Sequence, residues 1–343
     1  MASKSRKIRC QDLVAVAGAY LLILFSWLGV YLATGDRFTV IALLNFVAIF
    51  LFVPLALVLL VAITCKSRWL GIGFIIGAAA LLWFWGDLFI PRINRNPTTE
   101  PTLSVMTYNV LAWHNQYGPI LDTIRAENPD VLLLQELNTG LANILQNDLI
   151  DAYPYQVLVP VDNPEGIGVI SKFPIQPSEL TLPQLWAGGP QVLDLDWRGE
   201  QITLVNFHMF PTTSILPLDE VDRSIRFREQ EAQILAGLAN QSESAIMGGD
   251  ANTTSLSDAY KTITSVLVDA YRSAGFGLGH TFPGSTIPGS DRPHIGWLYV
   301  PAWVMRIDYV FHTPDWITVS ARTARIDDVS DHRGVIVELA KIK

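Results

Sequence analysis

The chain has 343 residues, a formal net charge of −8 and a hydrophobic content of 50%. This length allows one large domain and a further part, and the hydrophobic share is high for a soluble protein. The acidic balance argues against a protein that clamps long nucleic acid through a basic face.

Three nearly uncharged apolar runs, 13–34, 38–64 and 69–90, hold the hydrophobic excess, and Asp87 is their single charged residue. Each is long enough to cross a bilayer, which takes about 20 residues. The first could be a signal peptide, but its apolar part is too long and two further runs follow. The other alternative is that the runs are buried core helices, but their length and their lack of polar periodicity argue against it. The sequence therefore predicts three transmembrane helices in a membrane region, 1–90.

The basic residues of the short loops predict how these helices are oriented. Six precede the first run or lie between the second and third, and three lie on the other side: Lys4, Arg6, Lys7, Arg9, Lys66 and Arg68 against Arg37, Arg92 and Arg95. This bias predicts a cytoplasmic N-terminus, so the chain after residue 90 is expected outside the cytoplasm. The localisation predicted is integral to the plasma membrane, with an extracytoplasmic C-terminal domain.

The cysteines and charges of the two parts differ. Cys10 and Cys65 both fall on the predicted cytoplasmic side, and residues 91–343 contain no cysteine, which suits an oxidising compartment. The first 100 residues hold 9 Lys+Arg and 4 Asp+Glu, leaving 15 and 28 in the rest. The C-terminal part therefore carries a formal charge of −13.

After an extended linker, 91–101, the chain alternates short apolar runs with amphipathic ones over 102–343. The predicted strands are 103–111, 130–137, 167–175, 192–197, 202–210, 244–250, 305–313 and 334–339. The predicted helices are 117–128, 138–150 and 219–240. Mixed strands and helices over this length indicate a layered α/β domain.

Most of these strands end in, or lie beside, a carboxylate, amide or histidine: Asn109, Glu136, His208, Asp250, Asn252, Asp308, Asp331 and His332. One such ending can be a strand cap or a turn. When so many segments show it, the side chains are expected to converge on one rim of a sheet, where α/β proteins place their sites. Carboxylate and amide oxygens suit a hard cation such as Mg²⁺, with Mn²⁺ as the alternative. Histidine and carboxylate together suit proton transfer and charge stabilisation.

The ordered motifs MTYNVL, LLLQEL, LVNFH, GGDAN, RIDYVF and SDHRG resemble the endonuclease/exonuclease/phosphatase superfamily, the DNase I-like fold. The resemblance covers roughly 102–343 and implies a four-layer α/β sandwich whose site lies at one end. It also implies Mg²⁺-dependent hydrolysis of a phosphoester by water. The glycines of GGDAN are expected to let the backbone turn tightly and approach the site closely.

The resemblance also implies roles. Glu136 would be the main metal ligand, with Asn109 and Asp331 near the metal; His208, Asp250, Asn252, Asp308 and His332 would be catalytic. Among these, Asp250 would orient or deprotonate the attacking water, and Asp308 would hold His332.

Three functions remain open at this stage. The first is a membrane-anchored phosphatase or phosphodiesterase acting on a lipid-linked or membrane-proximal phosphate. In it, His280, Trp297 and Trp303 are candidate substrate-binding residues, and 295–303 could dip into the bilayer interface. The alternative is that both tryptophans pack on the domain itself. The second function is an extracytoplasmic nuclease, which the acidic charge disfavours. The third is a non-catalytic phosphate-binding module, which predicts losses among the motif residues.

Overall fold

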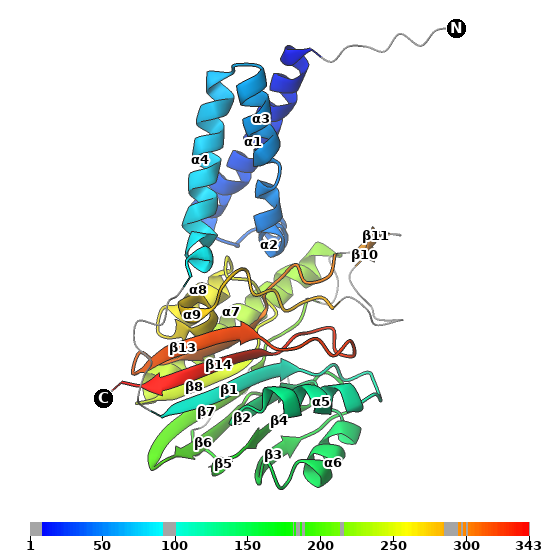
Figure 1. The fold of residues 1–343 in the computed structure, drawn as a ribbon, viewed down its shortest axis with the longest axis vertical. Helices are drawn as coiled ribbons and strands as arrows, with labels where there is room; N and C mark the ends of the chain where they lie inside the picture. Colours follow the sequence, from blue (N-terminus) through cyan, green and yellow to red (C-terminus); the bar gives the residue numbers. More distant parts are fainter. Residues whose placement is uncertain are drawn as a thin grey trace. The chain divides into compact units, whose positions relative to one another are not determined.

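The structure, a computed structural model, describes residues 9–91, 101–180, 182, 186, 189–212, 216–284, 294–295, 298–299 and 301–342. The chain divides into two units, Met1–Ile90 and Pro91–Lys343. Figure 1 shows the helices of the first and the sheets of the second. Of the predicted linker 91–101, residues 92–100 lie outside the described part.

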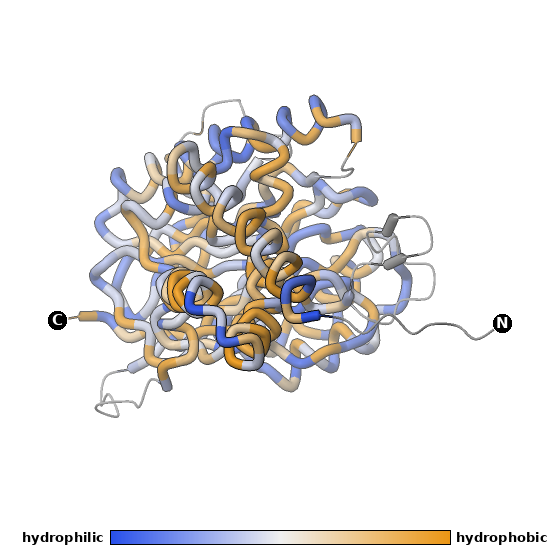
Figure 2. The backbone as a smooth tube through the Cα atoms, turned by 90° about the horizontal axis from the view of Figure 1, so that it is seen from above, coloured by the Kyte–Doolittle hydropathy of each residue, from blue (hydrophilic) through white to orange (hydrophobic). Residues whose placement is uncertain are grey.

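The N-terminal unit is helical. Its elements are α1 (Cys10–Thr34), α2 (Thr39–Phe46), the 3₁₀ helix η1 (Ala48–Phe52), α3 (Leu55–Thr64), α4 (Arg68–Trp85) and the 3₁₀ helix η2 (Gly86–Phe89). Two helices, Cys10–Thr34 and Arg68–Phe89, are long and apolar enough to cross a membrane. The backbone tube is largely orange, hence hydrophobic, along these helices (Figure 2).

The second predicted span, 38–64, is not one straight helix. Its two pieces, Thr39–Phe46 and Ala48–Thr64, meet at an angle of 80°, so the described part of the unit has two helices that could cross a membrane, or three candidate spans if the bent pair counts as one. Just before the bend, the buried side chain of Asn45 accepts a hydrogen bond from Trp27 Nε1 at 3.2 Å. Apolar composition predicts a span but carries no signal for such a bend.

A disulfide joins Cys10 at the start of α1 to Cys65 at the end of α3. Both residues were predicted on the same side of the membrane, but their pairing was not predicted. The covalent link adds to the packing between α1, α3 and α4.

The second unit contains two six-stranded mixed sheets. The first has the order β13-β14-β1-β2-β4-β3, built from Trp316–Thr323, Val335–Lys341, Thr102–Asn109, Val131–Gln135, Ile167–Ser171 and Tyr155–Val159. The second has the order β5-β6-β7-β8-β12-β9, built from Ile175–Pro177, Gln191–Trp197, Glu200–His208, Ala245–Asp250, Asp308–His312 and Val268–Asp269. A separate pair is formed by β10 (His294–Ile295) and β11 (Leu298–Tyr299).

The helices cover the outer faces of the two sheets. Helices α5 (Gly118–Glu127) and α6 (Thr139–Asp148) share a core with the first sheet, and α7 (Leu218–Gln241) and α8 (Asp258–Thr264) share one with the second. The short α9 (Ala270–Ala274) follows β9. A third core fills the space between the sheets. The layers are therefore helix, sheet, sheet and helix, and the predicted four-layer α/β sandwich is confirmed.

Besides the short β9, β10 and β11 and most of β5, two longer strands were not predicted, β3 and β13. Each of these two forms an outer edge of the first sheet. Residues of β3 are half-buried or exposed, whereas every residue of the central strand β2 is buried. Edge strands need no continuous apolar run, because one side faces solvent. Their sequence signal is therefore weak.

Candidate active site

The alternation of side chains along the central strands carries polar groups into the space between the sheets. On β1, Leu103 and Val105 face the core between the sheets, whereas Met106 and Tyr108 face α5 and α6. Because successive side chains of a strand point to opposite faces, Asn109 at the end of β1 points the same way as Leu103 and Val105. Its Nδ2 donates to Glu136 Oε1 at 3.0 Å and to Asp250 Oδ2 at 3.1 Å.

Glu136 follows the end of β2, where strand alternation alone would turn it toward α5 and α6. Its φ of 58° lies in the left-handed region, which non-glycine residues seldom occupy. Besides the bond from Asn109, its carboxylate accepts one from the backbone N–H of Ala112 at 3.1 Å. This backbone conformation lets Glu136 join the side chains that point between the sheets.

Asp250 ends β8, directly opposite His208 on the parallel strand β7 and Asp308 on the antiparallel strand β12. Gly248 and Gly249 lie inside β8 and not in a tight turn, so that expectation was wrong. A Cβ on Gly249 would lie 1.8 Å from the carbonyl oxygen of Phe207, and one on Gly248 would lie 2.6 Å from Leu133 Cδ1. The glycines therefore permit close packing behind the site.

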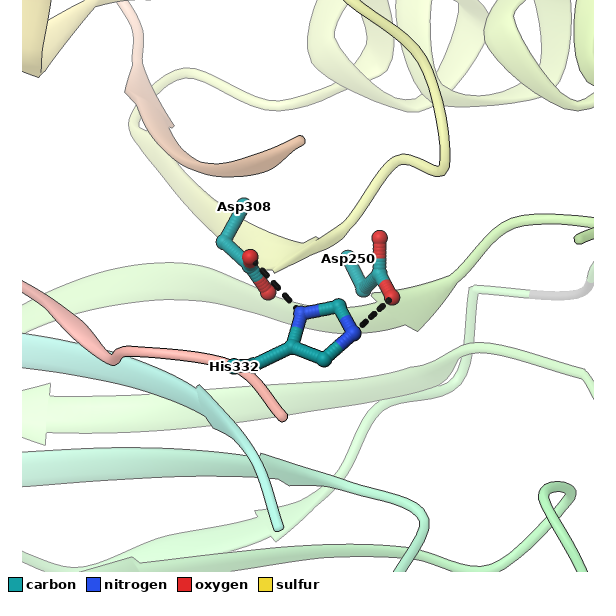
Figure 3. A group of neighbouring side chains, drawn as sticks. All are labelled: Asp250, Asp308 and His332. Atoms are coloured by element: carbon teal, nitrogen blue, oxygen red, sulfur yellow. Dashed lines mark hydrogen bonds and ion pairs between the residues drawn. The ribbon is translucent and has the colours of Figure 1, made fainter. Parts of the chain in front are cut away.

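Asp308, His332 and Asp250 form a line of hydrogen-bonded and charged groups (Figure 3). His332 Nδ1 lies 2.9 Å from Asp308 Oδ2, and its Nε2 lies 3.7 Å from Asp250 Oδ2. All three side chains are buried, and their ligand atoms lie within 4.8 Å of one another, close enough to hold a metal ion. His208 approaches from the other side, with Nε2 at 3.6 Å from Asp250 Oδ2.

Burial and mutual charge shift the pKa values of this group. Burial and then the neighbouring Asp308 raise the pKa of Asp250, His332 and His208 lower it, and the net result is a pKa of about 6. Burial by itself would lower the pKa of His332, but Asp308 and Asp250 outweigh it and hold that pKa well above its usual value. A carboxylate with a raised pKa beside an imidazolium is typical of acid–base chemistry.

The structure also places Asn252 and Asp331 beside this group. Asn252 has a φ of 49°; its backbone N–H donates to Asp250 Oδ1 at 2.8 Å, and its Nδ2 donates to the Met209 carbonyl at 2.9 Å. Asp331 Oδ1 lies 4.0 Å from His332 Nε2. Burial raises the pKa of Asp331, His332 lowers it and Glu136 raises it, so the Glu136 and Asp331 carboxylates repel each other. The eight strand-end residues predicted from sequence thus meet at one end of the two sheets.

Two of the three predicted substrate residues, His280 and Trp303, contact each other. His280 Nδ1 lies 2.7 Å from the Trp303 carbonyl oxygen, and burial lowers the pKa of His280. The Arg333 guanidinium lies 4.1 Å from the centre of the Trp303 ring. Trp303 is half-buried against the domain. Trp297 lies outside the described residues.

Four supporting residues were not singled out from sequence. Gln135 Nε2 donates to Asn206 Oδ1 at 2.6 Å between the sheets, directly behind Glu136 and His208. Thr281 Oγ1 accepts from the backbone N–H of Asp308 at 3.3 Å, and Ser330 Oγ accepts from that of His332 at 3.0 Å. The signal available for Gln135 and Asn206 was an amide at an inward position of an apolar strand. Thr281 and Ser330 had no such signal.

Comparison with known proteins supports the same fold. The profile of the Endonuclease/Exonuclease/phosphatase family matches residues 106–332. A comparison with curated proteins found no match. An endonuclease/exonuclease/phosphatase from Bacteroides vulgatus is similar in structure, with TM-score 0.52 and 19% identity over 71% of this chain and 100% of that one. TDP2 from D. rerio complexed with single strand DNA product is also similar, with TM-score 0.53 and 13% identity over 71% of this chain and 100% of that one. Truncated TDP2 from Caenorhabditis elegans has TM-score 0.52 and 18% identity over 70% of this chain and 98% of that one. The family match spans well over half of the chain, motifs and site included, and the chain therefore belongs to the endonuclease/exonuclease/phosphatase family.

Proposed function

We propose that this protein is a membrane-anchored, metal-dependent phosphoester hydrolase whose substrate is a lipid-linked or membrane-proximal phosphate. The observation that carries the hydrolase assignment is the buried line Asp308–His332–Asp250, with His208 and Asn109 directed at the same Asp250 carboxylate. A structural ion pair would need no such convergence from five separate segments of the chain.

The residues at this rim fit a divalent metal. Asp331 Oδ1 is buried without a hydrogen-bond partner, and the repulsion between Glu136 and Asp331 would be relieved by a cation held between them. Oxygen donors of this kind favour Mg²⁺, with Mn²⁺ as the alternative. We assign Glu136 and Asp331 as ligands, with Asn109 beside them. We do not assign Asp308 and Asp250 as metal ligands, because both face His332 and Asp308 already bonds to its Nδ1. A bound Mg²⁺ would neutralise charge on the phosphoryl oxygens.

The remaining residues supply positioning and proton transfer. Asp250, with a pKa of about 6, is mostly ionised near neutral pH and accepts a proton from the attacking water. His332, held by Asp308, donates to a phosphoryl oxygen as charge develops there. His208 Nδ1 is held by the Pro164 carbonyl at 3.0 Å, which leaves Nε2 directed at the site. Asn252, fixed by Met209, lies where its amide can meet another phosphoryl oxygen.

The membrane part and the charge support the choice of substrate. Two or three apolar helices provide an anchor, and the part of the chain after residue 100 has a formal charge of −13, which disfavours a nucleic-acid polyanion. The bias of basic residues supports an extracytoplasmic catalytic unit.

The decisive experiment measures phosphate release from a lipid monophosphate by the purified full-length protein, with plasmid nicking in parallel. We expect Mg²⁺-dependent release that EDTA abolishes and added Mg²⁺ restores, without nicking. Asp250→Asn should reduce turnover by about a thousandfold, the scale of losing a catalytic group. Asp148→Asn, at an exposed position on α6, is the matched control and should retain activity. Equal turnover by Asp250→Asn and the unaltered protein would refute the assignment, and nicking without release would identify a nuclease.

A further inference from the structure

A cavity of about 290 Å³ opens beside His208. Its walls include Pro164, Glu165, Ile167, His208, Met209 and Phe210. His208 therefore belongs to both places: its Nε2 lies 3.6 Å from Asp250, and its Nδ1 bonds to Pro164 in the cavity wall. A group bonded to a phosphorus atom at the site would have this cavity within reach.

The wall made by segment 208–212 is fastened along its length. The Met209 N–H donates to the Asp250 carbonyl, and the Met209 carbonyl accepts from Asn252 Nδ2. The His208 carbonyl accepts from Trp186 Nε1 at 3.1 Å. Such a wall has its shape before a ligand arrives, which favours binding because little ordering is needed.

Helix α7 fastens the rest of this segment through buried side chains. Glu231 accepts from the Phe210 N–H at 2.8 Å, and Arg228 Nη1 donates to the Phe210 carbonyl at 2.9 Å and to Thr212 Oγ1 at 2.8 Å. The rings of Phe210 and Phe227 stack at 4.9 Å. Charged side chains are seldom buried, so the use of Glu231 and Arg228 to hold one loop indicates that the conformation of this loop matters.

The chemistry of the walls selects the occupant. Most of the lining side chains are apolar, the polar ones are Asn163 and His208, and the one carboxylate, Glu165, is exposed. Among the described residues that line the cavity there is no lysine or arginine. Such a cavity favours apolar groups, and Glu165 repels a second anion. The volume is near the lower end for ligand sites, about 300–1,000 Å³, and suits a short alkyl chain or one ring.

We infer that this cavity binds the uncharged, apolar group esterified to the phosphate, directly next to the site of hydrolysis. The inference rests on the proposed function and narrows its substrate to phosphoesters of apolar alcohols. Ile167 and Phe210 are then residues that determine specificity.

Binding of simple alkyl phosphates tests this without any turnover. Titrations of hexyl phosphate, methyl phosphate and 5-carboxypentyl phosphate would use full-length protein in lipid nanodiscs with Mg²⁺, so that no detergent competes for the cavity. We expect hexyl phosphate to bind at least about tenfold more tightly than methyl phosphate, because each buried methylene adds affinity. The carboxylate-bearing chain should lose most of that gain, and Glu165→Gln should restore part of it.

Two pairs of variants locate the effect. Ile167→Phe should bring the hexyl-to-methyl affinity ratio close to one, whereas Val159→Phe, opposite it on β3 and exposed, should leave the ratio unchanged. Phe210→Ala should change the ratio more than Phe227→Ala, since both break the same stacked pair but only Phe210 lines the cavity. A ratio near one in the unaltered protein, or one that Ile167→Phe does not alter, would overturn the inference. If the unaltered protein released no phosphate but still preferred hexyl to methyl phosphate, the result would count against the hydrolase proposal alone.

Discussion

At the scale of single residues, the backbone at the site adopts conformations that side chains normally avoid. Glu136 and Asn252 both have left-handed φ values, 58° and 49°. Each such conformation costs on the order of 1–3 kcal/mol and persists where the surroundings fix it. Here the surroundings are the bonds from Asn109 and Ala112 to Glu136 and those from Asn252 to Asp250 and Met209. The strain coincides with the residues assigned to metal and phosphate.

Glycine-to-alanine substitutions should have opposite effects at two positions. Gly249→Ala places a methyl group against the Phe207 carbonyl at 1.8 Å, so the free energy of unfolding should fall by several kcal/mol, roughly 3 or more. Gly237→Ala in α7 meets nothing within 4 Å and should raise it by about 0.5–1 kcal/mol through helix propensity. Thermal unfolding of the full-length protein compares the two. If Gly249→Ala unfolded at the same temperature as the unaltered protein, the tight contact between β7 and β8 would not exist in solution.

At the scale of elements, α7 links the core behind the second sheet to the site. Its first turn carries Asp219 and Glu220, where acidic side chains interact favourably with the helix dipole. Two turns further on, Arg228 and Glu231 are buried and bonded to segment 208–212. The helix therefore fixes the strand end that bears His208.

The buried Glu231 should make the stability of this arrangement depend on pH. Burial raises its pKa to about 7 from 4.5, against lowering by the Phe210 N–H and Arg228. Below pH 4.5 the folded and unfolded chains both hold the proton. Between pH 4.5 and 7 only the folded chain holds it, so stability falls as pH rises, and the loss is complete above pH 7.

Glu231→Gln removes this titration. Relative to the unaltered protein, its free energy of unfolding should rise by on the order of 1–3 kcal/mol between pH 4.5 and 7.5. Urea titrations at several pH values measure the difference. Glu243→Gln, exposed just beyond the same helix, removes a carboxylate without touching segment 208–212 and is the reference. A difference for Glu231→Gln that does not vary with pH would contradict the raised pKa.

At the scale of the whole molecule, the chain combines an apolar helical unit with a hydrolase fold that carries most of the acidic charge. The basic residues predict that the N-terminus and the Cys10–Cys65 disulfide lie on the cytoplasmic side. A reducing cytosol normally keeps such thiols reduced. The disulfide and the charge bias therefore favour different orientations. We give more weight to the charge bias, because thiols this close can pair or separate with the surrounding redox state.

Labelling of a single cysteine decides the orientation. In a Cys10→Ser, Cys65→Ser background, Glu200→Cys at the exposed start of β7 should react with a membrane-impermeant maleimide in intact cells. A Cys10→Ser variant, in which Cys65 is the only remaining cysteine, should react only after the cells are permeabilised. The reverse pattern would place the catalytic unit in the cytoplasm and would agree with an oxidised Cys10–Cys65 pair.

The sequence by itself determined the family, the layered α/β class, the apolar N-terminal region and the strand-end residues Asn109, Glu136, His208, Asp250 and His332. These follow from residue type, local periodicity and motif order, which are properties of short segments. It also placed most central strands and the helix at 219–240 within a few residues of β1, β2, β7, β8 and α7.

Only the tertiary structure decided which of these side chains meet and what supports them. The bonds from Asn109 to Glu136 and Asp250, the hydrogen bond between the Gln135 and Asn206 amides, the bend after Asn45 and the disulfide all join residues far apart in the chain, or depend on such contacts. The same holds for the cavity beside His208, whose walls come from two sheets. Such features depend on the register and packing of whole sheets, and no short segment contains that information.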